Sequence, residues 1–216
     1  MEDLVLQRHV LDELCFDPKL DAAHIGVIAE KGIVTLTGHV TSYAEKVAAE
    51  HAARRVKGVR AIAEKIEVRL PNHKRIADDE IAQRVADILA LNATIPANAI
   101  QISVHDGWVN LEGAVQWQFQ RAEAQKQVSN LSGLTGIINN IALKPRPSPP
   151  DTQQQIEDAL QRNRQLAGRS IKVTVTQNDH VILDGDVHEL EQLRAAEKIA
   201  WQVPGVTSVD NRLEVL

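Results

Sequence analysis

The sequence predicts an α+β protein built from three tandem copies of one small α-β-β-α-β unit. The first observation is a Val-x-Leu-x-Gly pattern that occurs three times and closes at Gly38, Gly113 and Gly185. The second is a further glycine that follows each of these after the same interval, at Gly58, Gly133 and Gly205. The interval between copies is too long for one turn of a solenoid and suits a small domain.

The repeat sets the expected domain boundaries. Copy one is expected at residues 1–71, copy two at 75–143 and copy three at 151–216. The stretch 144–150 is rich in proline and is expected to be a semi-rigid linker. The connection at 71–74 is short, so copies one and two are expected to form a pair.

The first element of each copy is an amphipathic helix. In copy one, Leu6, Val10 and Leu14 recur at helical spacing. In copy two, the acidic residues 78–80 are expected to cap the positive end of the helix dipole. Cys15 is interpreted as a packing residue and not a reactive thiol, and a single cysteine excludes an internal disulfide framework.

A hairpin is expected next. Alternating apolar residues from Ile25 to Ala29 predict a half-buried strand. Lys31-Gly32 and Asp106-Gly107 suit a two-residue turn that needs positive φ angles. Copy three has one more residue here, so Gln177-Asn178-Asp179 is expected to form a longer loop.

The second helix and the last strand complete the unit. Ser42-x-x-Glu45 is a capping pattern, and a stripe of small residues lets the helix lie close to the sheet: Ala49, Ala52 and Ala53. Gly58, Gly133 and Gly205 are interpreted as left-handed caps at the end of this helix. Ile62, Ile66 and Val68 then predict a final strand.

This element order and the glycine motifs resemble the BON domain family over nearly the whole chain. Copy three ends in the pattern Val-x-x-Val-x-Asn-x-Leu-x-Val with Asn211, copy two keeps Asn139, and copy one places Glu64 there. The resemblance implies a three-stranded mixed sheet with two helices on one face. It also implies a bacterial protein linked to osmotic or envelope stress, of a kind proposed to bind phospholipid surfaces.

The two asparagines allow two interpretations. Asn139 and Asn211 are interpreted as structural side chains that hydrogen-bond nearby backbone. The alternative is a direct contact with a ligand.

Composition and motifs exclude several functions. The formal net charge is −5 and no copy is basic, which argues against nucleic acid as a partner. No apolar run approaches the roughly 20 residues of a membrane-spanning helix. The start lacks a secretory signal, so a cytoplasmic protein is expected, with any membrane contact peripheral at the inner membrane. Phosphate-loop, serine-elbow and metalloprotease motifs are absent, so neither an enzyme nor a cofactor is expected.

Candidate binding residues are apolar. Helices cover one face of each sheet, which leaves outward positions on the other face at Ile28, Ile33, Trp108 and Ile182. These positions either pack between copies or contact a lipid or protein partner. Trp117 and Phe119 are the best candidates for a surface anchor, with packing beneath the second helix as the alternative.

Ion binding is a second hypothesis, because some cytoplasmic relatives of the BON type are thought to respond to potassium. Carboxylates at Asp179, Asp184 and Asp186 suit a hard cation, although acidic residues at turns are usually only solvated. His105 and His180 flank hairpin turns, yet no metal site is predicted. The first hypothesis is therefore a non-enzymatic module that associates with phospholipid membrane surfaces or membrane-bound assemblies in osmotic or envelope stress. The alternatives are a potassium or small-ligand sensor and a protein-interaction scaffold.

Overall fold

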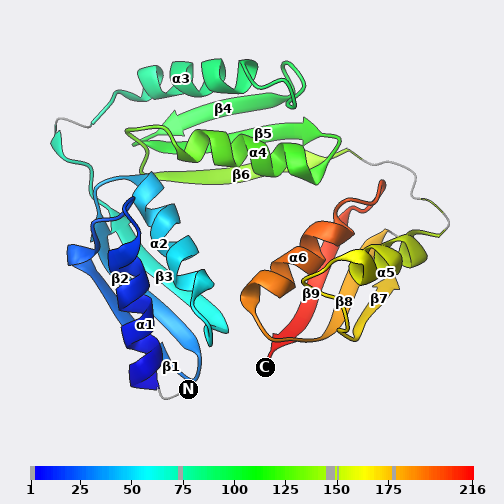
Figure 1. The fold of residues 1–216 in the computed structure, drawn as a ribbon. Helices are drawn as coiled ribbons and strands as arrows, with labels where there is room; N and C mark the ends of the chain where they lie inside the picture. The colour runs from blue at the N-terminus through cyan, green and yellow to red at the C-terminus, as the bar shows by residue number, and fades with distance from the viewer. Residues whose placement is uncertain (1–2, 73–74, 145–148, 150, 177–178) are drawn as a thin grey trace. The chain divides into compact units, whose positions relative to one another are not determined.

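The fold confirms the α+β prediction. A computed structural model describes the chain except residues 1–2, 73–74, 145–148, 150 and 177–178. The described residues form six α-helices and three three-stranded sheets (Figure 1). They divide into two compact units, Met1–Val115 with Gln120–Ala142, and Gln116–Phe119 with Leu143–Leu216.

Copy one has the order predicted for the unit. It contains α1 (Asp3–Phe16), a short 3-10 turn (Ala22–His24), β1 (Ile25–Glu30), β2 (Ile33–Val40), α2 (Tyr43–Arg55) and β3 (Ala61–Val68). Strand β1 pairs with β2 in antiparallel fashion, and β2 pairs with β3 in parallel. A parallel pair needs a crossover connection, and α2 supplies it.

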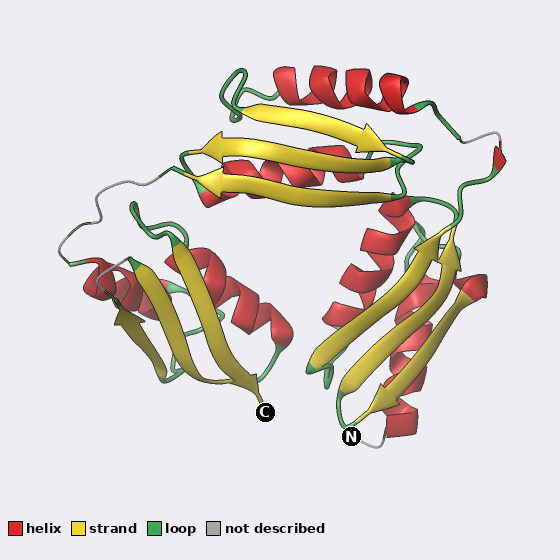
Figure 2. Ribbon diagram, turned by 180° about the vertical axis from the view of Figure 1, so that it is seen from behind, coloured by secondary structure: helices red, strands yellow, loops and turns green. Residues whose placement is uncertain are grey.

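Copies two and three repeat this order. Copy two contains α3 (Asp78–Ala90), β4 (Ile100–His105), β5 (Trp108–Val115), α4 (Gln118–Ser129) and β6 (Gly136–Leu143). Copy three contains α5 (Thr152–Arg162), β7 (Ile171–Val175), β8 (His180–Val187), α6 (Leu190–Ala200) and β9 (Ser208–Val215). In each copy the helices lie on one side of the sheet and leave the other face open (Figure 2).

The first helix packs as its periodicity predicts, with one exception. Leu6, Val10 and Leu14 are buried. Cys15 is exposed, so its interpretation as a packing residue is wrong. Cys15 directly follows the buried residue Leu14. Consecutive residues of a helix are rotated by about 100° around its axis, so the thiol is turned toward solvent.

The hairpin turns of copies one and two are confirmed. Lys31 and Gly32 have φ angles of 50° and 82°, and Asp106 and Gly107 have 50° and 75°. In copy three Asp179 also has a positive φ of 57°, but Gln177 and Asn178 lie outside the described residues.

The acidic cluster of α3 lies in the first turn of its helix, as predicted, but it makes no side-chain cap. The N-cap residue is Ala77, which makes no side-chain cap. The Asp78 carboxylate instead accepts the backbone N–H groups of Asp106 and Gly107, each at 2.9 Å. Asp3 accepts the N–H of Lys31 at 2.9 Å in the same way. These carboxylates fasten each hairpin turn to the start of the first helix.

The later glycines lie beyond the helix ends. Gly58, Gly133 and Gly205 have φ angles of 93°, 88° and 91°. However, α2 ends at Arg55, α4 at Ser129 and α6 at Ala200, so these glycines form the turn before the last strand and do not cap the helix. The prediction for the 144–150 linker concerns residues that lie mostly outside the described part of the chain.

Candidate functional site

Asn139 and Asn211 join the second helix to the last strand. Asn211 donates Nδ2–H to the carbonyl oxygen of Leu193 at 2.9 Å and accepts the N–H of Leu213 through Oδ1 at 3.3 Å. Asn139 makes the same pair of bonds, to the Arg121 carbonyl at 3.1 Å and from the Ile141 N–H at 3.3 Å. Both amide groups are thus engaged with the backbone of their own copy.

Copy one makes the same junction with an ion pair. Glu64 replaces the asparagine, and its carboxylate accepts from the Ile66 N–H. A carboxylate has no hydrogen to donate to the helix. Lys46 of α2 supplies the missing donor. Its ammonium group lies 2.9 Å from the Glu64 carboxylate and donates to the Ile66 carbonyl at 2.9 Å.

The open faces of the three sheets differ at one corresponding place. Ile33 of β2 pairs with Ala61 in copy one, and His180 of β8 pairs with Ser208 in copy three. In copy two the place is taken by Trp108, whose ring covers Gly136. The His180 ring bonds the Ser208 hydroxyl at 2.6 Å, so copy three is polar where copy two is aromatic.

The open face of the second sheet carries a large aromatic side chain, Trp108. We call it the Trp108 face and define it by six residues: Trp108, Asn110, Glu112, Gly136, Ile138 and Asn140. Trp108 and Ile138 are each 46% exposed. Sequence reasoning missed Ile138, although its alternation with buried Ile141 and half-buried Ile137 along β6 was a usable signal.

The other predicted outward residues lie on separate sheets. Ile28 and Ile33 are exposed on the first sheet, whereas Ile182 is half-buried on the third. The first face also carries Lys65 and Glu67. The third carries a mixture of charges: Lys172, Asp184, Asp186, Asp210, Arg212 and Glu214.

The two predicted anchor residues have different environments. Phe119, in the first turn of α4, is 55% exposed, and Trp117 just before the helix is half-buried. The stretch 114–120 contains no charged residue. At the place of Phe119, copy one has Ala44 and copy three has Glu191, so the aromatic side chain is particular to copy two.

The proposed cation ligands do not converge. Asp179 precedes β8 while Asp184 and Asp186 lie on it, and five residues of a strand span roughly 16 Å. Asp184 pairs in register with Lys172 and Arg212, whose positive charges compete with a cation. No specific observation therefore favours an ion site there.

One group in the described residues has the composition of a metal site. Donor atoms of Asp78, His105 and Asp106 lie within 4.8 Å of one another. Both Asp78 oxygens already accept backbone N–H groups, and His105 and Asp106 are exposed. Copy one has Lys31 where copy two has Asp106, so the group is not repeated. His105 ends β4 of copy two and His180 begins β8 of copy three.

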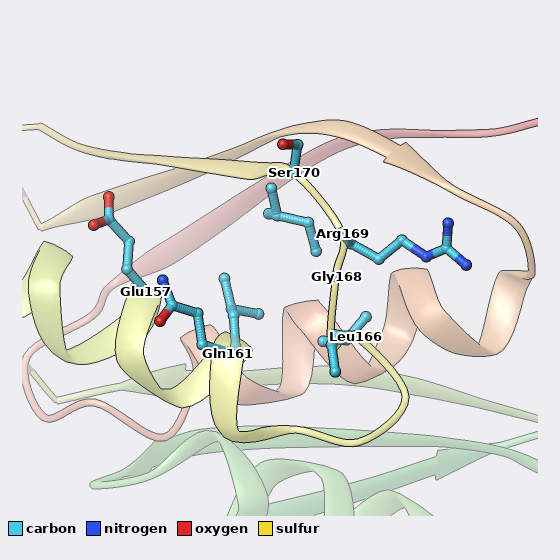
Figure 3. A pocket seen from close by; sticks show the side chains of 9 residues that line it. Glu157, Gln161, Leu166, Gly168, Arg169 and Ser170 are labelled. Atoms are coloured by element: carbon cyan, nitrogen blue, oxygen red, sulfur yellow. The ribbon is translucent and has the colours of Figure 1, made fainter.

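A cavity of about 330 Å³ in copy three lies between α5 and the segment before β7. Glu157 and Gln161 line it from the helix, and Ser170 lines it from the segment (Figure 3). The Arg169 side chain points away from both helix residues and donates to His188 Nε2 at 2.7 Å. The lining thus brings together no paired acid and base of the kind that proton transfer needs.

Shifted pKa values mark helix packing. A backbone N–H from Lys19 and the Arg55 guanidinium lower the pKa of Asp17. Hydrogen bonds to Glu13 and Asp17 raise the pKa of Arg55, which links α2 to α1. Burial raises the pKa of Tyr43, and the nearby Glu64 charge adds to this shift.

Comparison with known proteins gives matches over most of the chain. The model of the BON domain family matches residues 2–69, 77–145 and 150–216. Osmotically-inducible protein Y of Escherichia coli (strain K12) is 24% identical over 148 residues, which cover 67% of this chain and 74% of that protein. None of the helices in the described residues has the length and apolar character to span a membrane.

Two solved structures also align with the chain. Both are of CdsD, a structural protein of the type III secretion system of Chlamydia trachomatis. The first, of its C-terminal domain, has a TM-score of 0.28 and 15% identity, and covers 100% of this chain and 98% of that one. The second has a TM-score of 0.27 and 17% identity, with 99% and 92% covered.

Proposed function

From the premise that this chain belongs to the BON domain family, we propose that it is a non-enzymatic module that binds phospholipid membrane surfaces during osmotic or envelope stress. The relative named for osmotic induction supports the connection with stress. We expect the contact with the membrane to be peripheral.

The observation that carries the proposal is Phe119. Its ring is 55% exposed and belongs to a stretch, 114–120, without any charge. On helices that lie at a membrane surface, Phe, Trp and Leu side chains are buried at the boundary between lipid headgroups and acyl chains. An uncharged surrounding matters because moving a charge out of water would cost far more than burial of the ring gains. The corresponding Glu191 makes copy three unsuitable for the same contact.

The net charge of −5 predicts which lipid is bound. Anionic vesicles repel an acidic chain, while zwitterionic phosphatidylcholine does not. Binding driven by an apolar side chain also resists salt, because screening weakens charge interactions and leaves apolar burial intact. We therefore expect the chain to bind phosphatidylcholine vesicles at high as well as low ionic strength.

The variant Phe119→Asp tests this function. We expect it to weaken co-sedimentation with phosphatidylcholine vesicles about tenfold or more, because the burial of one phenylalanine side chain is lost. An aspartate in the first turn of α4 meets the positive end of the helix dipole, so the fold should be kept.

Phe16→Asp is the matched control. Phe16 is 83% exposed at the end of α1 but is followed by Asp17 and Lys19, so its substitution should leave vesicle binding unchanged. Equal loss in both variants would show that binding follows general hydrophobicity and not Phe119. Absence of binding to any vesicle by the wild-type chain would contradict the proposed function.

A further inference from the structure

The indole ring of Trp108 lies flat on the backbone of Gly136. A Cβ built on Gly136 would overlap three consecutive ring carbons, Cε3, Cζ3 and Cη2, at nearly equal distances. A point equally close to three consecutive ring atoms lies over the face of the ring and not in its plane. One face of the indole therefore presses on the sheet. Because Trp108 is still 46% exposed while Gly136 is buried, the other face is turned to solvent.

A row of polar side chains lies beside this ring. Asn140 donates to Asn110 Oδ1 at 2.9 Å, and Asn110 donates to Glu112 Oε1 at 2.7 Å. Each of these amides has a second N–H, and the carboxylate has a second oxygen. The Trp108 face thus combines a flat aromatic platform with adjacent donors and acceptors.

The charges on the Trp108 face determine which class of ligand it can bind. In the part of the second sheet that the structure describes, no Lys or Arg lies on the open face, whereas the other two faces carry Lys65, Lys172 and Arg212. Nucleotides and anionic headgroups need such cations to neutralise phosphate. An acyl chain would remove water from the polar row without replacing its hydrogen bonds.

A neutral carbohydrate satisfies both parts of the face. The C–H groups on one side of a sugar ring carry partial positive charge, which the negative face of an indole attracts. Its hydroxyl groups both donate and accept, as the amides and the carboxylate do. We propose that the Trp108 face binds a neutral carbohydrate. This site is separate from Phe119 and does not depend on the phospholipid function.

The test uses the full chain with soluble neutral oligosaccharides, namely oligomers of glucose and of N-acetylglucosamine. Binding is measured by calorimetry and by saturation-transfer NMR. We expect at least one oligosaccharide to bind, and Trp108→Ala to weaken its binding about tenfold or more. Gly136→Ala should also weaken binding, since the added Cβ displaces the ring without removing it. Ile33→Ala, at the same place in copy one, should change nothing.

Several outcomes overturn the proposal. One is that no oligosaccharide binds the folded wild-type chain, and another is that binding survives Trp108→Ala. A third is that phosphatidylcholine vesicles, and no sugar, bind in a manner that depends on Trp108, which would assign the face to lipid. If Trp108→Ala unfolds copy two, Asn110→Asp takes its place. It loses a donor beside Glu112 while keeping the ring, and unchanged binding in that variant counts against the site.

Discussion

Gly113→Ala is expected to destabilise copy two by roughly 2–5 kcal/mol. Gly113 has a φ of +127°, and a Cβ there would overlap the carbonyl oxygen of Ala99. Strand β4 would have to move away from β5 to relieve the overlap. The closing glycine of each motif has the same environment, because Gly38 faces the His24 carbonyl and Gly185 faces that of Ser170.

Gly168→Ala separates the cost of backbone strain from the cost of the overlap with the Ala99 carbonyl. Gly168 also has a positive φ, of +81°, but a Cβ there meets nothing within 4 Å. Its substitution should cost only the backbone strain, about 1 kcal/mol. Hydrogen exchange reports each copy separately, which matters because three domains need not unfold in one step. Equal loss of protection in the two variants would show that the contact with Ala99 is unimportant.

Asn211→Glu is expected to destabilise copy three by about 1–3 kcal/mol. The substitution removes the donor to the Leu193 carbonyl and places a carboxylate beside it. Copy one tolerates Glu64 because Lys46 lies opposite, and residue 193 of copy three is the leucine at the corresponding place.

The double variant Asn211→Glu, Leu193→Lys should recover part of that loss by recreating the ion pair of copy one. Hydrogen exchange of β8 and β9 amides in the single and double variants gives the coupling between the two sites. Strictly additive effects would contradict the equivalence of the two junctions.

The fold was largely predictable because the repeat shows the same pattern three times. Burial of Leu6, Val10 and Leu14 and the turn at Lys31-Gly32 follow from local periodicity and turn chemistry. The role of Asp78 was not predictable, because its partner N–H groups belong to a hairpin nearly thirty residues away. Local reasoning assigned that carboxylate to the nearest helix dipole.

The candidate site was only partly predictable. Alternation along β5 placed Trp108 on the open face, and the uncharged stretch indicated Phe119. The match between Trp108 and Gly136 depends on the parallel register of β5 and β6, which are separated in sequence by the crossover helix. Hydrophobic alternation within one strand tells which face each side chain occupies, but not which residue of the neighbouring strand lies opposite it.

Membrane contact by the 114–120 stretch is tested most directly with a spin label. Cys15 is the single cysteine of the chain and is exposed. The double variant Cys15→Ser, Gln116→Cys therefore carries one label, three residues from Phe119. The wild-type chain labelled at Cys15 is the control. On addition of phosphatidylcholine vesicles, we predict that the label at 116 loses access to a water-soluble relaxation agent and that the label at 15 does not. Unchanged access at residue 116 with vesicles in excess would contradict the account.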